Sequence, residues 1–134
     1  MRDDTARPLA NLRLVVAEDE VMTMMLLEDM LEELGGTVVA LVKTQDEVIT
    51  AVDEHRPDAV TLDADLSGEL AYRAAAELQR RDIPFVFISG YETFPDCPPG
   101  LQDCLRLKKP FRMDDLATVM RMAVKGRTRG RAGP

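Results

Sequence analysis

The chain has 134 residues, of which 46% are hydrophobic and 31% charged, with a formal net charge of −7. This length corresponds to one ordinary domain, and the negative charge argues against non-specific nucleic-acid binding by the folded body. Because no apolar run approaches the ~20 residues of a membrane span and the polar start does not resemble a signal peptide, we expect a cytoplasmic protein.

The first half of the chain alternates apolar runs with helical patterns. The run at 12–17 predicts a buried strand. Apolar residues then recur at helical spacing from 22 to 34, where Gly35 and Gly36 end the helix. The sequence at 37–42 predicts a second strand, which a second helix follows.

A second helix is expected to end near Arg56, because the residue before Pro57 disfavours helical backbone. Thr44 is placed to cap its first turn, with Glu47 as the capping-box partner three residues later.

The second half continues the alternation with strands at 59–62, 85–88 and 105–107. Helices are expected at 69–81 and 113–125. The strands are apolar runs without clean polar alternation, which is typical of strands covered on both faces. We therefore predict an α/β fold with a doubly wound, five-stranded parallel sheet.

The segment 91–104, "YETFPDCPPGLQDC", occupies the place of a fourth helix. Pro95, Pro98 and Pro99 each cost a helix interior about 3 kcal/mol. We expect a loop with one or two helical turns at most.

Cysteine and histidine are too few for the usual metal or nucleophile sites. Cys97 and Cys104 have no further cysteine to complete a zinc set, and we expect both to be reduced. His55, the only histidine, lies at a polar helix end, where a general-base role is not expected. The carboxylates remain as candidates for chemistry.

Carboxylate, hydroxyl and ammonium groups follow four of the five strands. In chain order these strands end in Glu18, Asp19 and Glu20, in Asp63, in Ser89, and in Lys108 and Lys109. In a doubly wound sheet the carboxyl ends of the strands form the binding edge. These side chains should therefore meet in one site.

Clustered carboxylates invite a hard cation such as Mg²⁺, which prefers oxygen ligands. A carboxylate is also a nucleophile toward phosphorus and forms an aspartyl phosphate, whose oxygens need a metal, a lysine and a hydroxyl as partners. Single features have plain structural explanations, such as a helix cap at Asp19 or a turn at Ser89. Together they predict a phosphoryl site.

The chain resembles the receiver domain of bacterial two-component response regulators over residues 12–125. The resemblance is carried by "VVAEDE", "PDAVTLDADLSGE", "PFVFISGY" and "LKKPF". It implies a flavodoxin-like fold with strand order 2-1-3-4-5. It leaves 1–11 as an N-terminal extension and 126–134, "GRTRGRAGP", as a disordered basic tail.

By this resemblance Asp63 is the aspartate phosphorylated by a histidine kinase, while Ser89 and Lys109 bind the phosphoryl group. The side chain of Asp65, two residues after Asp63, matches a position that tunes dephosphorylation. The cofactor would be Mg²⁺, with Mn²⁺ as a substitute. The implied metal ligands are Glu18, Asp19, Asp63 and the backbone carbonyl of Asp65.

Arg106 departs from the family pattern, because receivers usually carry an aromatic switch residue three positions before the lysine. The stretch "PFVFISGY" resembles the stand-alone "FAT GUY" subgroup of receivers, with Ile88 for Ala and Ser89 for Thr. That subgroup also lacks the usual switch and often has an irregular fourth helix. We expect Tyr91 to contribute to the switching surface instead.

The resemblance implies a single-domain response regulator rather than an enzyme with turnover. Its expected partners are a sensor histidine kinase or histidine phosphotransfer protein and an unknown output protein. We expect no DNA-binding domain, since only a short tail follows the last helix, and a monomer or weak homodimer. A tail contact with nucleic acid is a minor alternative.

Other functions stay open at this point. The same chemistry suits a phosphate sink or a phosphorelay intermediate. The Asp63-x-Asp65 pattern also suits a haloacid-dehalogenase-like phosphatase, or a nucleotide-sugar transferase that holds a metal, although neither explains Glu18 and Asp19. A pseudo-receiver that binds a partner without phosphorylation would not need Ser89 and Lys109.

Overall fold

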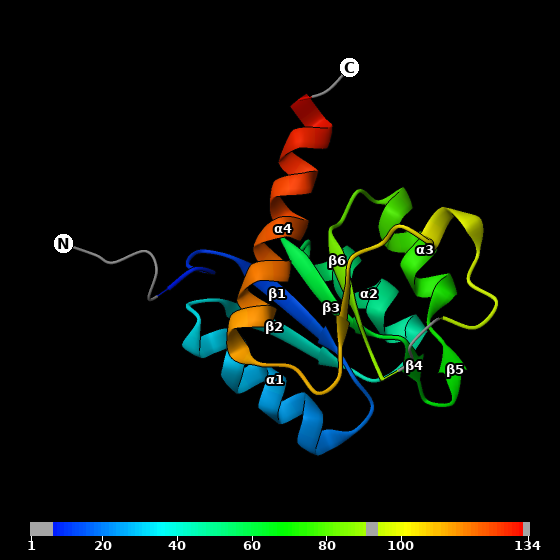
Figure 1. The fold of residues 1–134 in the computed structure, drawn as a ribbon, viewed down its shortest axis with the longest axis horizontal. Coiled ribbons are helices and arrows are strands. Elements are labelled where there is room, and N and C mark those ends of the chain that lie inside the picture. The colour runs from blue at the N-terminus through cyan, green and yellow to red at the C-terminus, as the bar shows by residue number, and fades with distance from the viewer. Residues whose placement is uncertain (1–6, 91–93, 133–134) are drawn as a thin grey trace.

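A parallel five-stranded sheet forms the middle layer of the protein (Figure 1). The computed structural model describes residues 7–90 and 94–132, with side chains up to 126. The strand order β2-β1-β3-β6-β7 is the predicted 2-1-3-4-5 order, so the predicted fold class is confirmed. The strands are β1 (Arg13–Ala17), β2 (Thr37–Val42), β3 (Ala59–Asp63), β6 (Phe85–Ser89) and β7 (Arg106–Lys108).

Helices cover both faces of this sheet, because alternate strand residues point to opposite sides. Leu14 and Val16 of β1 pack into one apolar cluster with α1 and α4. Val15 and Ala17 pack into a second cluster with α2 and α3. The helices are α1 (Val21–Glu33), α2 (Gln45–His55), α3 (Tyr72–Arg80) and α4 (Met113–Ala132).

The predicted N-cap of α2 is confirmed, because the Glu47 N–H donates to Thr44 Oγ1 over 3.1 Å. This bond satisfies a backbone donor that a helix start leaves without an intrahelical partner. The Glu47 carboxylate accepts from the Lys43 N–H over 2.8 Å, one residue before the N–H of a standard capping box. The β2–α2 connection is thereby held at the edge of the sheet where the strands end.

A small hairpin occupies residues 65–70 and overlaps the predicted start of the third helix. β4 (Asp65–Leu66) pairs antiparallel with β5 (Glu69–Leu70), and α3 begins only at Tyr72. The expected start at Glu69 was therefore wrong. Ser67 and Gly68 form the two-residue turn with φ of +53° and +84°, as hairpin turns of this length require.

The segment after β6 follows the prediction from its prolines. Within its described part the regular structure is one short 3₁₀ helix, η1 (Pro99–Leu101). Its first residue is a proline, which lacks the N–H that a helix start leaves unpaired. The fourth helix of a regular five-unit fold is thus reduced to a single turn.

Regular structure is present near both ends of the described chain. Leu9 is fully buried and its N–H donates to Leu34 O over 2.9 Å. At the other end α4 runs to Ala132. The predicted domain bounds of 12 and 125 stay a prediction. Gly126 weakens a helix by only about 1 kcal/mol and does not end this one. Within the described residues, no helix combines the length and apolarity that crossing a membrane requires.

Candidate phosphoacceptor and metal site

The carboxyl ends of four strands surround one polar cleft of about 640 Å³. The parallel register brings them together, since β3 lies between β1 and β6, and β7 pairs with β6. Of the residues predicted to meet at the strand ends, Lys108 alone is missing from the lining of this cleft. The lining is Glu18, Asp19, Glu20, Asp63, Asp65, Gly68, Ser89, Gly90 and Lys109.

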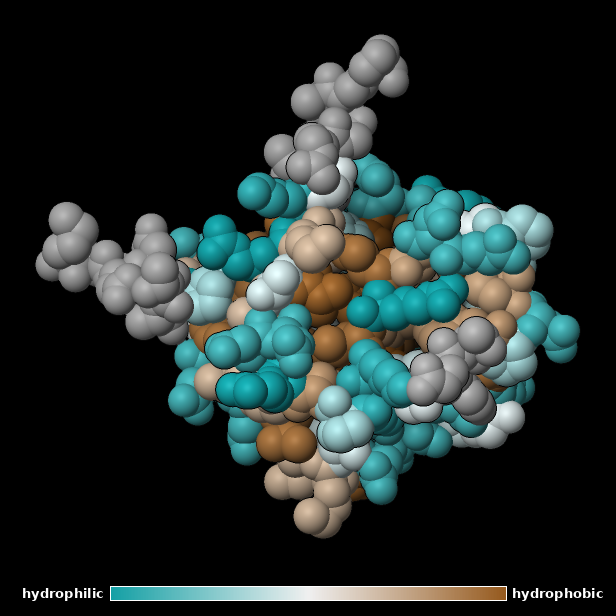
Figure 2. Space-filling view, in the orientation of Figure 1, coloured by the Kyte–Doolittle hydropathy of each residue, from teal (hydrophilic) through white to brown (hydrophobic). Residues whose placement is uncertain are grey.

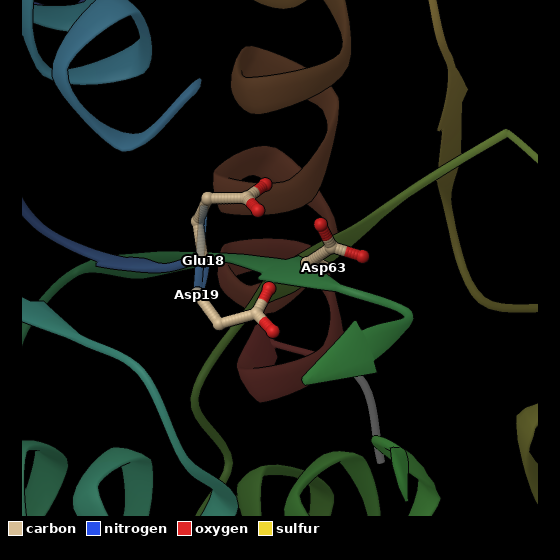
Figure 3. Close-up of side chains that lie close together, drawn as sticks. All are labelled: Glu18, Asp19 and Asp63. Carbon is tan, nitrogen blue, oxygen red and sulfur yellow. The ribbon is translucent and has the colours of Figure 1, made fainter. Parts of the chain in front are cut away.

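Three carboxylates turn toward a common space in the cleft (Figure 3). Glu18 and Asp19 follow β1, and Asp63 ends β3. One oxygen from each lies within 4.8 Å of the others. Glu18 and Asp63 are buried, while Asp19 is partly exposed. This is the arrangement in which a divalent cation offsets like charges.

Each of these carboxylates accepts a backbone hydrogen bond on one oxygen. Glu18 Oε2 accepts from the Glu20 N–H over 3.1 Å, and Asp63 Oδ1 accepts from the Asp65 N–H over 2.9 Å. Asp19 Oδ2 accepts from the Ser67 N–H over 2.8 Å. These bonds fix the rotation of the three groups by holding one oxygen of each.

Lys109 contacts the second oxygens of the two buried carboxylates. Its Nζ lies 2.9 Å from Asp63 Oδ2 and 3.5 Å from Glu18 Oε1. The residue follows β7, and its peptide bond to Pro110 is cis. The ammonium therefore neutralises part of the charge that Asp63 and Glu18 bring into the cleft.

Burial and charge alter the ionisation of this site. Desolvation, followed by a hydrogen bond with Asp63, raises the pKa of Glu18 from 4.5 to about 7. Desolvation alone would lower the pKa of Lys109, but its hydrogen bond to Asp63 and the charges of Asp63 and Glu18 raise it. The folded site thus favours the protonated form of Glu18 more than water does, and it favours the charged form of Lys109.

The predicted switch and tuning residues lie in different places. Asp65 begins β4 with an exposed side chain at the cleft. Arg106 begins β7 outside the cleft lining, and its guanidinium carbon lies 4.1 Å from the centre of the Phe94 ring. Tyr91 falls outside the described residues.

The sequence pattern did not single out Ser67, which bonds Asp19, or Gln45, which bonds the β4–β5 hairpin through Glu69. Ser67 bonds Asp19 as given above. Gln45, 5% exposed, donates from Nε2 to Glu69 over 3.0 Å and accepts from the Ala74 N–H over 2.9 Å. A polar residue next to a helix cap was the one available signal for Gln45. The turn at Ser67–Gly68 was the signal for Ser67.

The chain belongs to the family of response regulator receiver domains, whose model matches residues 14–121. Membership places it in two-component signalling, as a phosphoacceptor signalling module rather than a classical enzyme, and implies a kinase partner in general. The buried acidic triad is typical of the metal site in this family. The phosphatase and transferase alternatives are therefore set aside.

Similar proteins share this domain but differ in length. "Transcriptional regulatory protein PdtaR" of Mycobacterium tuberculosis is 29% identical over 116 residues, which are 84% of this chain and 56% of PdtaR. The chain thus spans about half the length of that curated relative. Among solved structures, PhyR from Brucella abortus superposes with a TM-score of 0.80 at 27% identity, covering 96% of this chain and 53% of PhyR. SdrG from Sphingomonas melonis Fr1 gives 0.72 at 35% identity, covering 88% of this chain and 98% of SdrG.

Proposed function

We propose that this chain is a response regulator that accepts a phosphoryl group on Asp63 from a histidine kinase or histidine phosphotransfer protein. The observation that carries the proposal is the pairing of a buried aspartate at the end of β3 with the ammonium of Lys109, 2.9 Å away. Asp63 lines the cleft, and the ammonium of Lys109 compensates its negative charge. We place the protein in the cytoplasm, where these phosphodonors act.

In the transfer, an oxygen of Asp63 forms a bond to phosphorus as the P–N bond of phosphohistidine breaks. The imidazole nitrogen keeps the electron pair of that bond and takes up a proton. Lys109 then pairs with a phosphoryl oxygen in place of the Asp63 oxygen that it contacts now. Ser89, 4% exposed at the end of β6, lines the same cleft and supplies a hydroxyl to a second oxygen.

The donor set fits Mg²⁺, with Mn²⁺ as a substitute. All three clustered groups are carboxylates, and each has one oxygen tied to the backbone, so each suits single-oxygen ligation of a small cation that keeps several waters. The ligands would be Glu18, Asp19, Asp63 and the backbone carbonyl of Asp65. When bound, the metal neutralises charge on the transferring group.

The phosphodonor is expected to dock on the first half of α1, beside the site. Val21, Met22, Met25 and Leu26 are 50%, 79%, 56% and 56% exposed, and Figure 2 shows hydrophobic colours gathered at the end of the molecule where Figure 1 places α1. A pocket of about 420 Å³ lies between α1 and Lys109–Phe111. An apolar surface that adjoins Lys109 suits a protein donor.

We propose that output goes through a protein contact, as in stand-alone members of the "FAT GUY" subgroup. The stretch "PFVFISGY" and Arg106 in place of the usual aromatic switch support this assignment. The switching surface would include Tyr91 and Arg106, with Asp65 setting the lifetime of the phosphoryl group. Tyr91→Ala should then weaken phosphorylation-dependent partner binding. We expect a monomer or weak homodimer.

The proposal is tested by intact mass after incubation with Mg²⁺ and a small phosphodonor such as acetyl phosphate. Wild type should gain one phosphoryl adduct, and Asp63→Ala should gain none. An adduct on both, or on neither, would contradict the assignment. A pull-down with and without beryllofluoride then separates a switch, which gains a partner, from a phosphate sink, which does not.

A further inference from the structure

Ser67 contacts Asp19 across 48 residues of sequence. It occupies the first turn position of the β4–β5 hairpin, and its N–H points to Asp19 Oδ2 at 2.8 Å. Its φ of +53° is rare for a residue with a side chain. The N–H of this strained turn residue is thus aimed at the one carboxylate of the acidic triad that is partly exposed.

Two hydrogen bonds and one buried side chain hold the hairpin that carries Ser67 in place. The Ser67 hydroxyl donates to Lys43 O over 2.9 Å, next to the capped start of α2. Leu66 is 1% exposed and belongs to the core. Glu69 accepts from Gln45, which is itself buried. The Ser67 N–H is therefore presented by a rigid support and not by a free loop.

We propose that Ser67 is a positioning residue for the metal site, which fixes the Asp19 carboxylate through its backbone N–H. Asp19 lies on the connection between β1 and α1, where a partly exposed side chain would otherwise sample several rotamers. With Oδ2 held, Oδ1 is the freer ligand beside Glu18 and Asp63. The inference deepens the proposed function, because it names what orders one of the proposed ligands.

Removing the N–H should weaken metal binding, since outer-shell partners of metal ligands typically contribute about 10- to 100-fold in affinity. Ser67→Pro deletes the donor, and we expect it to lower Mg²⁺ and Mn²⁺ affinity at least about 10-fold in calorimetric titration. Ser67→Gly keeps the N–H and adopts positive φ readily. It should recover affinity to within about twofold of wild type, a difference of about 0.4 kcal/mol.

Proline also disturbs the turn, so the test includes Asp19→Ala, which removes the acceptor, in a double-mutant cycle. If Ser67 acts through Asp19, Ser67→Pro will lower affinity far less in the Asp19→Ala background than in wild type. An equal loss in both backgrounds, or no loss in either, would overturn the proposal. The titration contains no phosphodonor, so its outcome is independent of whether Asp63 is phosphorylated.

Should Ser67→Pro fail to fold, an ester in place of the Leu66–Ser67 amide removes the same N–H while keeping the serine side chain. Wild type should also protect the Ser67 N–H from hydrogen exchange without metal, and Asp19→Ala should lose that protection. Fast exchange of this N–H in wild type would overturn the proposal.

Discussion

The ammonium of Lys109 donates a hydrogen bond to the carboxylate of Asp63, with Nζ and Oδ2 2.9 Å apart, although 46 residues separate them in sequence. Asp63 is the last residue of β3 and Lys109 follows β7, so both lie at the carboxyl edge of one parallel sheet. The same ammonium lies 3.5 Å from Glu18 Oε1. The Lys109 ammonium thus contacts the two buried acids of the site. It also lies where it can pair with a phosphoryl group on Asp63.

Lys109→Ala should slow phosphorylation of Asp63 by a small phosphodonor. Removal of one preorganised donor from developing charge typically costs about 100-fold or more in rate. Lys108→Ala is the matched control, because Lys108 is adjacent and exposed but does not line the cleft. The rates are followed by intact mass over time. Equal rates for the two variants would remove Lys109 from the transfer.

Metal-free protein should become less stable as pH rises from about 5 to 8. Burial, followed by hydrogen bonding to Asp63, raises the pKa of Glu18 to about 7 from 4.5, so between these values the folded state binds more protons than the unfolded state. Stability falls with pH where that holds. The loss should be on the order of 2 kcal/mol.

Chemical denaturation in EDTA at several pH values measures this slope. Glu18→Gln, which stays neutral, should remove most of the decline between pH 5 and 8. A variant with the same pH dependence as wild type would show that another group is responsible.

Thr44→Ala should destabilise the protein by about 1 kcal/mol, the usual cost of losing an N-cap side chain. The Thr44 hydroxyl oxygen accepts the Glu47 N–H over 3.1 Å. Thr50→Ala is the control, since Thr50 is exposed inside α2 and alanine favours a helix there. Denaturation midpoints should fall for the first variant and stay level or rise for the second.

Arg106→Ala should destabilise the protein by about 1 kcal/mol through loss of the contact with Phe94, whose ring centre lies 4.1 Å from the guanidinium carbon. Phe94 packs edge-on against Phe87, with 4.9 Å between the ring centres. Phe87 lies in β6, two residues before Ser89. Arg106→Lys should keep part of the stability. If Arg106→Ala matches wild type in denaturation, Arg106 does not hold Phe94 in place.

The sheet and most of the cleft were predictable because their signals are local. Strand ends carry Glu18, Asp63 and Lys109, and a parallel sheet gathers strand ends at one edge. Thr44 caps a helix and the prolines of 91–104 prevent one, and both effects depend on the residue type alone. These features need no knowledge of which side chains meet.

The β4–β5 hairpin was missed because strands of two residues have no detectable period. Its turn also places Ser67, not glycine, at the first positive φ. The role of Ser67 is carried by its backbone, so no residue type marks it. The raised pKa of Glu18 likewise depends on burial in the folded chain, which the sequence pattern does not measure.

We propose that Asp63, and not its neighbour Asp65, carries the phosphoryl group. Borohydride reduces an aspartyl phosphate to homoserine, which marks the modified position in peptide mass spectra. After phosphorylation in the presence of Mg²⁺, we expect homoserine at position 63 and at no other aspartate. Homoserine at position 65, or at 19, would contradict it.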